Sequence, residues 1–309
     1  MHASLQEFLQ SRRRAGSYAG LHIEAAAIGT IGAMFSLALA ATVAVAAASS
    51  PDPANLPLGD GKVTTEGAKR GWVYRCGGGP GGPGGGAQAA GPWIREDEGT
   101  FDATAKAIVD GEVRWAQARV RIVRRGRVRR VVSNGLPVAG ITGTFPIARE
   151  DDAYQYDRNP NSISAHSFDL RLPARPRRAR RASCLSPGPI GIAVNGVPIF
   201  DALDAMSRDA VAWETQDVCG GHPERTGSYH YHAIPACLTK GASTSKHSPV
   251  VGYALDGFAI RGPRGARGKL LSTSDLDACH GHRHGGSYHY HATLDYPYTL
   301  GCLRGTTAN

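Results

Sequence analysis

The heptapeptide G-S-Y-H-Y-H-A occurs twice in the chain, at Gly227–Ala233 and at Gly286–Ala292. The segment that precedes it is repeated as well, because D-V-C-G-G-H at Asp217–His222 recurs as D-A-C-H-G-H at Asp277–His282. Each copy ends at a further cysteine. The two parts recur at offsets of 59 and 60 residues, which identifies an internal duplication.

The Tyr-His-Tyr-His tetrapeptide has the two-residue period of a β-strand. In the first copy, His230 and His232 therefore leave one face of the strand, and the two tyrosines leave the other. The second copy repeats this arrangement with His289 and His291. We expect the tyrosines to pack in the core with their hydroxyls satisfied. These residues are Tyr229, Tyr231, Tyr288 and Tyr290.

A third histidine precedes each H-x-H pair by seven or eight residues, a distance that a turn can fold back. Three neutral imidazoles with an open position suit copper or zinc, so we expect one of these ions as the cofactor. The predicted metal ligands are His222, His230, His232, His282, His289 and His291. The alternative is that these histidines are hydrogen-bonded inside a tyrosine-rich core without metal. His280 and His284, present in the second copy alone, either enlarge its site or face solvent.

Four aspartates lie in or near the repeats. Such carboxylates can bind the metal directly, accept a hydrogen bond from an imidazole N–H or act as a general base toward metal-bound water, and we expect the second of these roles. The candidates are Asp217, Asp277, Asp256 and Asp295.

The six cysteines lack a C-x-x-C arrangement, which favours disulfides over a thiolate metal site. Six cysteines permit about 15 pairings. The repeat suggests two local bonds, Cys219 with Cys237 and Cys279 with Cys302, and these leave Cys76 with Cys184.

The N-terminal region has the features of an export signal. Arg12, Arg13 and Arg14 precede an uncharged run from Ala25 to Ala48, which ends in A-x-A. We interpret residues 1–48 as a signal peptide, or else as an N-terminal membrane anchor. Residues 49–92 form an N-terminal segment with a Gly-rich linker at 77–92, and residues 93–309 form the main domain. The localisation that follows is exported: periplasmic, cell-envelope or secreted.

The composition favours a single, mainly β domain with little helix. Among the 309 residues are 40 Gly and 19 Pro, which leave little room for long helices. We expect a β meander over residues 101–132 with a hairpin tip at Arg125-Gly126, and a loop at Arg171–Arg181. The net charge of +9 permits contact with polyanions, but the arginine runs contain no interleaved aromatics, so we interpret them as solvated and expect no nucleic-acid partner.

The two heptapeptides resemble the signature of the YHYH domain family, a group of mostly exported proteins named for this tetrapeptide. The likeness covers roughly Trp93 to Gly305. Other segments similar to the family pattern are N-G-L-P at Asn134–Pro137, G-T-F-P-I at Gly143–Ile147, Y-D-R-N-P-N at Tyr156–Asn161, N-G-V-P-I-F at Asn195–Phe200, G-Y-A-L-D-G-F at Gly252–Phe258 and Y-P-Y-T-L-G-C at Tyr296–Cys302. The resemblance implies a YHYH domain at 93–309 and no particular activity.

Three functions fit these observations. The first is an exported metal-binding protein that uses the duplicated His-x-His strands. The second is an extracellular metal-dependent hydrolase with a His-ligated ion. The third is a secreted structural or interaction module without metal. The metal ion is the expected partner, a membrane is expected only through the N-terminal apolar segment, and the sequence indicates no particular protein partner.

Overall fold

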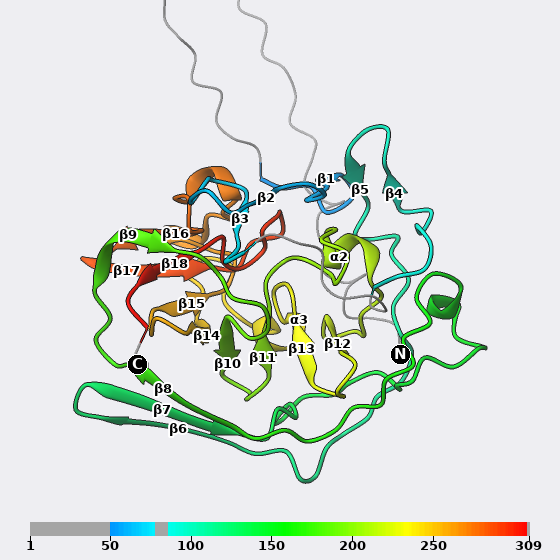
Figure 1. The fold of residues 1–309 in the computed structure, drawn as a ribbon, viewed down its shortest axis with the longest axis horizontal. Coiled ribbons are helices and arrows are strands. Elements are labelled where there is room, and N and C mark those ends of the chain that lie inside the picture. The colour runs from blue at the N-terminus through cyan, green and yellow to red at the C-terminus, as the bar shows by residue number, and fades with distance from the viewer. Residues whose placement is uncertain (1–49, 78–85, 308–309) are drawn as a thin grey trace, which may run out of the picture. The chain divides into compact units, whose positions relative to one another are not determined.

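The duplicated segments form the two halves of one eight-stranded sheet (Figure 1). The computed structural model describes residues 50–77 and 86–307, which belong to one compact unit. The predicted signal segment and part of the Gly-rich linker lie outside the described residues. The strands of this sheet are β10 (Gly191–Ala193), β11 (Pro198–Ile199), β12 (Gly221–Pro223), β13 (Tyr229–Tyr231), β14 (Val250–Ala254), β15 (Ala259–Arg261), β16 (Gly281–His284) and β17 (Ser287–His291).

The strand order, β12-β13-β11-β10-β14-β15-β17-β16, is a palindrome of two equivalent halves. Each half contains an antiparallel hairpin, a parallel pair and a second antiparallel hairpin at the edge. The pairing of Ile199 with Tyr231 in the first half recurs as Ile260 with Tyr290 in the second. The duplication therefore begins at β10, about 26 residues upstream of the repeat that the sequence motifs revealed.

The two halves meet where β10 pairs antiparallel with β14. Ile192 lies opposite Tyr253, and these two residues occupy equivalent positions in the two copies. A local two-fold axis that relates the two copies therefore lies between Ile192 and Tyr253. The sheet thus places the two histidine segments at its opposite ends.

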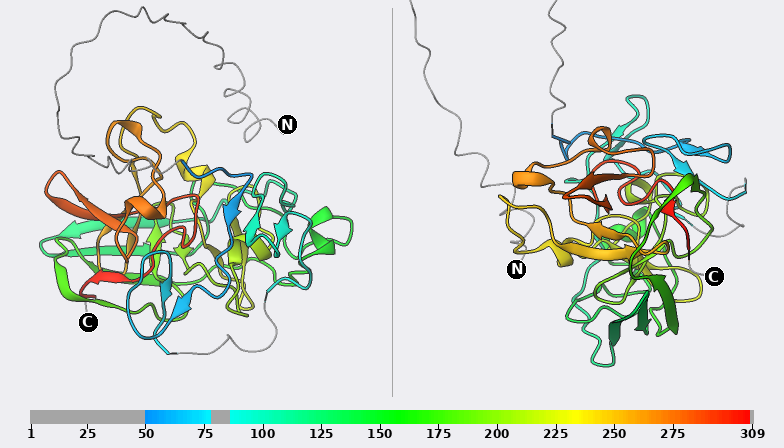
Figure 2. Two further views of the ribbon diagram at one scale, coloured as in Figure 1. Left: turned by 90° about the horizontal axis from the view of Figure 1, so that it is seen from above. Right: turned by 90° about the vertical axis from the view of Figure 1, so that its left-hand side faces the viewer.

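A second sheet covers the centre of the first. Its strands are β6 (Val120–Arg125), β7 (Val128–Ser133) and β8 (Phe168–Pro173), which run below β10 and β14 in Figure 1 and again lie beneath the yellow and orange strands in the right-hand view of Figure 2. Val131 and Leu172 from its inner face pack with Ile192, and Tyr253 contacts the same cluster.

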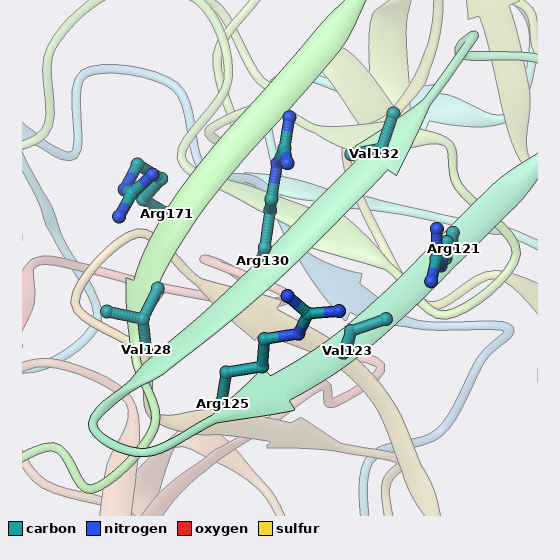
Figure 3. A pocket seen from close by; sticks show the side chains of 7 residues that line it. All are labelled: Arg121, Val123, Arg125, Val128, Arg130, Val132 and Arg171. Carbon is teal, nitrogen blue, oxygen red and sulfur yellow. The ribbon is translucent and has the colours of Figure 1, made fainter.

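The outer face of this second sheet is basic. Figure 3 shows arginines and valines alternating along β6 and β7, with Arg171 beside them on β8, where they line a cavity of about 320 Å³. The lining residues are Arg121, Val123, Arg125, Val128, Arg130, Val132 and Arg171. The inner face carries mainly aliphatic side chains and the outer face carries the exposed arginines together with part-buried valines, which agrees with the two-residue period of the strands.

The remaining elements are short and surround the large sheet. The small sheets consist of β1 (Leu56–Pro57), β5 (Thr100–Phe101) and β4 (Ile94–Arg95); β2 (Val63–Thr64) and β3 (Val73–Tyr74); and β9 (Arg178–Ser183) and β18 (Leu303–Gly305). The helices are α2 (Ala210–Trp213), α3 (Ala236–Thr239), η1 (Asp152–Gln155), η2 (Ala266–Gly268) and η3 (Thr273–Asp275). No helix among residues 50–77 and 86–307 is long and apolar enough to cross a membrane.

The prediction of a mainly β, disulfide-stabilised domain is confirmed, and so are the three pairings. The hairpin tip at Gly126 is also confirmed, since Gly126 has a φ of 58° between β6 and β7. The meander is wrong in extent. Residues 102–119 form only isolated bridges at Val109 and Val113, and the third strand is β8 instead. The arginine-rich loop is also wrong in part, because Arg178–Ser183 pairs with β18.

The boundary predicted at residue 93 does not separate two packing units. Leu56, Val73 and Trp93 share the main core with Tyr229 and Tyr290. The Cys76–Cys184 bond also attaches the N-terminal segment to the strands that lead into β10. The described part of the N-terminal segment is therefore integral to the fold that carries the histidines.

Candidate metal centres

Each edge hairpin of the large sheet brings three histidines together. In the first copy, His222 on β12 lies directly opposite His230 on β13, and His232 follows at the end of that strand. The turn that the sequence predicted between His222 and the H-x-H pair is thus this hairpin. We call these three residues the first triad.

The first triad is buried, with 3–4% of each residue exposed. The Nε2 atoms of His230 and His232 lie 3.0 Å apart. The Nδ1 atoms of both residues contact backbone carbonyls, those of Ser228 and Asp201. A carbonyl can only accept, so each Nδ1 carries the proton and each Nε2 presents a lone pair. Burial lowers the pKa of His230 to about 4, and it lowers the pKa of His232 well below its usual value, so both rings are neutral near pH 7.

The second triad has the same plan. His282 on β16 lies opposite His289 on β17, and His291 ends that strand. The three Nε2 atoms form a triangle with sides of 3.2, 3.1 and 3.2 Å. The Nδ1 of His291 donates to the carbonyl of Gly262 at 2.6 Å, which is the counterpart of the His232 contact with Asp201. Burial lowers the pKa of His289 to about 3 and that of His291 to about 2.

These nitrogen separations match the donor set of a metal site. Zinc–imidazole bonds of about 2.0–2.1 Å in a tetrahedral site place neighbouring nitrogens about 3.3 Å apart. A hydrogen bond between two of these Nε2 atoms needs a proton on one of them, yet for His230 and His232 the proton is already on Nδ1. Two lone pairs at 3.0 Å repel each other unless a cation lies between them. The six predicted ligands thus form two separate groups that could each hold a metal ion.

A fourth group joins each triad, and the sequence reasoning missed both. In the first triad it is Glu214, whose Oε2 lies 3.5 Å from Nε2 of His222 and 3.7 Å from Nε2 of His232. In the second triad it is His247, whose Nε2 lies 3.2 Å from that of His289. Neither residue recurs in the other copy, so the repeat gave no signal for them. Comparing the copies by offset places Ser274 where the first has Glu214.

Glu214 is held at the site by a short helix. Asp209 caps the N-terminus of α2 through Val211 N and Ala212 N, and Glu214 follows the helix directly as its C-cap. Burial raises the pKa of Glu214 well above its usual value, and the charges of Asp157 and Asp204 raise it further. The Oε2 atom of Glu214 and both ring nitrogens of His222 have no hydrogen-bond partner among the described residues. Unpartnered buried polar atoms of this kind are costly unless a ligand completes them.

The four aspartates have other partners than the imidazoles. Asp217 and Asp277 accept from the hydroxyls of Tyr229 and Tyr288 at 2.7 and 3.1 Å, on the tyrosine face of the strands. Asp256 accepts from Tyr290 at 2.5 Å, and Asp295 accepts from the backbone N–H of Thr273. Our expectation that they accept from imidazole N–H groups is corrected for the described structure. Backbone carbonyls take that role instead, because the tyrosine-facing carboxylates lie on the wrong side of the strand.

The two extra histidines of the second copy have different positions. His280 is buried, its Nε2 contacts Thr293 Oγ1 at 3.0 Å, and it is not part of the four-histidine group. His280 has a φ of 71°, and its counterpart Gly220 has a φ of 74°, so the turn is preserved in both copies. His284 is exposed, and its ring stacks on that of His247 at 5.1 Å between centroids.

Comparison with known proteins gives one result. A comparison with curated proteins and another with solved structures found no match. The family model described as YHYH protein matches residues 169–270, which contain the first triad, Glu214 and His247 and end before the second triad. The resemblance seen in the sequence is therefore confirmed for residues 169–270, where the chain carries a YHYH-family region.

Proposed function

We propose that this protein binds two transition-metal ions, copper or zinc, one at each triad, and acts as an exported metal-binding protein. The observation that carries the proposal is the convergence of the Nε2 atoms within each triad. Backbone carbonyls hold the ring proton of His230, His232 and His291 on Nδ1, which leaves their Nε2 lone pairs free. Nitrogen donors without thiolate suit these two metals among the common biological ions. All six cysteines are in disulfides, so no thiol competes for the ion.

The disulfides and the N-terminal sequence both support export. Three disulfides are typical of proteins that fold in an oxidising environment. The uncharged run from Ala25 to Ala48 is the sequence feature of an export signal. Burial of the first triad favours retention of an ion there over turnover of a substrate.

The test is elemental analysis of untagged protein purified from its native compartment, beside two double variants. We expect about two equivalents of metal in the native protein. The His230→Gln, His232→Gln variant and the His289→Gln, His291→Gln variant should each lose about one equivalent. The matched control is His166→Gln, which lies outside both triads and should keep both ions.

A metal-free protein that also resists reloading with Zn²⁺ or Cu²⁺ would overturn the proposal. In that case the strands would be scaffold alone. Circular dichroism of each variant shows whether a loss of metal reflects the loss of ligands or the loss of the fold.

A further inference from the structure

The environments of the two triads differ at equivalent positions. Phe200 precedes the first triad and Arg261 occupies the same position before the second, since the two copies align at an offset of 61 residues there. The ring of Phe200 stacks on His230 at 4.1 Å between centroids. Arg261 lies on β15 directly opposite His291. One site therefore has an apolar wall where the other has a cation.

The fourth residue at each triad also makes the second site more positive than the first. Glu214 adds a carboxylate to the first triad, whereas His247 adds a neutral ring to the second. A divalent ion at the first site would have its charge reduced to about +1 by its carboxylate neighbour. At the second site no member of the four-histidine group is anionic, and the charge of Arg261 opposes a cation at His289 and His247. Asp275 and Asp277 act on His282, but neither belongs to the group.

Exposure separates the sites further. The first triad and Glu214 are buried, the latter with 8% of its surface exposed. In the second site His282 and His247 are half-buried. His247 lies in the segment between α3 and β14, outside any helix or strand, and its neighbours from Lys240 to Lys246 are largely exposed. A ligand on such a segment can leave the ion without disturbing the sheet.

From these differences we infer that the two sites have different tasks: the first, completed by Glu214, retains its ion, while the second, covered by His247, exchanges its ion with the surroundings. This inference rests on the proposed function. The carboxylate and the low dielectric make release from the first site slow, because the attraction between an ion and an anionic ligand is strong where water is excluded. At the second site, displacement of His247 opens a coordination position through which a competing ligand can enter.

The charge of Lys106 lowers the pKa of Glu214, but Lys106 makes its hydrogen bonds to other residues. Its ammonium group contacts the carbonyl of Val211 at 2.5 Å and the side chain of Gln216. Burial lowers its pKa to about 8. The Oε2 atom of Glu214 therefore faces the imidazoles without a hydrogen bond from any described residue.

The test is the rate of metal release from protein loaded with two equivalents of Zn²⁺, followed in a stopped-flow instrument with an excess of a chromogenic chelator. We expect two phases of one equivalent each. The His289→Gln, His291→Gln variant should lose the fast phase, and the His230→Gln, His232→Gln variant should lose the slow phase. Glu214→Gln should accelerate the slow phase at least about tenfold and leave the fast phase unchanged.

Two further variants test how the charge at Glu214 and the ring at His247 each affect the release rates. Glu214→Asp keeps the charge at a greater distance and should give an intermediate slow rate. His247→Asn should accelerate the fast phase alone. Glu66→Gln, at an exposed glutamate outside both sites, is the matched control and should release metal as the native protein does.

Release of both equivalents in one phase, or a slow phase that is the same in Glu214→Gln as in the native protein, would overturn the inference while leaving the proposed function intact. Failure of the native protein to take up two equivalents would instead overturn the proposed function, and the inference with it. If Glu214→Gln does not fold, the native and Glu214→Asp traces still decide between one phase and two.

Discussion

At the scale of single residues, the Tyr-His-Tyr-His alternation separates two kinds of polar chemistry across one strand. The histidines converge on each other, whereas the tyrosine hydroxyls reach carboxylates and amides in the core. Tyr229 donates to Asp217, and that carboxylate also accepts from the backbone N–H groups of Gly143, Cys219 and Gly221. These bonds fix the edge hairpin that carries His222 and His230. The tyrosines therefore do not contact the metal site but stabilise the hairpin that positions its histidines.

Replacement of Tyr229 by phenylalanine should lower the stability of the protein without reducing its metal content. Tyr229→Phe removes one partner of a buried carboxylate, which we expect to lower the free energy of unfolding by about 1–3 kcal/mol. The three backbone donors to Asp217 remain, so the hairpin should persist. Urea unfolding and elemental analysis of the same sample measure both quantities. Loss of one equivalent of metal from a folded Tyr229→Phe protein would contradict this assignment.

Asp209 allows the pH dependence of the free energy of unfolding to be tested at a residue outside the two triads. Burial raises the pKa of this carboxyl to about 6 from an ordinary value of 3.8, against hydrogen bonds from Tyr298 and Gly59 that lower it. A raised pKa means that the folded state prefers the protonated acid. Its contribution is therefore fully present below pH 3.8 and is lost as the pH rises toward 6.

We expect the stability of the metal-free native protein to fall across this interval relative to Asp209→Asn, by up to about 3 kcal/mol. The measurement is denaturant unfolding at several pH values between 4 and 7 with a chelator present. Since Asn cannot ionise, the difference between the two profiles isolates Asp209. Parallel profiles for the two proteins would show that Asp209 does not titrate in this range.

Sequence reasoning found six of the eight residues around the metal centres, because those six belong to a repeated pattern. Glu214 and His247 were missed for a physical reason: each completes one copy alone. Glu214 is placed by a one-turn helix and His247 by an irregular segment. The partners of the four aspartates were also mispredicted, since sequence spacing does not show which side of a strand a distant carboxylate approaches.

At the scale of elements, the junction between β10 and β14 depends on two equivalent glycines. A Cβ at Gly191 would lie 2.8 Å from the carbonyl oxygen of Tyr253, and a Cβ at Gly252 would lie 2.8 Å from that of Ile192. Both glycines are thus required for the close approach of the central strands. The two-fold relation between the copies predicts that the two positions respond alike.

Gly191→Ala and Gly252→Ala should each lower the free energy of unfolding by about 1–3 kcal/mol, because the backbone must shift to relieve overpacking. Gly67→Ala is the control, since a Cβ there meets nothing within 4 Å. Chemical denaturation measures all three. If either central variant proved as stable as Gly67→Ala, the close pairing of β10 with β14 would be wrong.

The two heptapeptides predicted β13 and β17 closely, because the Tyr-His-Tyr-His alternation lies on a strand in both copies. The meander was mispredicted because the arginine-rich strands β6 and β7 pair with β8, a partner from the other side of a long irregular region. Strand-forming composition at residues 102–119 did not give strands, since tertiary contacts decide such segments.

At the scale of the whole molecule, the three disulfides differ in what they join. Cys219–Cys237 and Cys279–Cys302 span 18 and 23 residues and close each copy of the repeat, whereas Cys76–Cys184 spans 108 residues and joins the N-terminal segment to the main core. In the chain-entropy account, the longer loop contributes more to stability.

Replacement of both Cys76 and Cys184 by Ser should therefore destabilise the protein by about 4–5 kcal/mol, compared with about 3 kcal/mol for the Cys219, Cys237 pair. Hydrogen exchange should show increased opening at residues 50–77 in the first variant and at the first hairpin in the second. Equal protection of residues 50–77 in both variants would contradict the assignment of each disulfide to a different part of the fold.

The central claim is that two ions lie where the Nε2 atoms of the triads converge. The most direct measurement is an anomalous difference map recorded at the absorption edge of the metal, from crystals of the metal-loaded protein. We predict two peaks, each about 2.0–2.1 Å from the Nε2 atoms of one triad, with Glu214 beside the first and His247 beside the second. Crystals with well-ordered histidines and no anomalous peak at either triad would contradict the account.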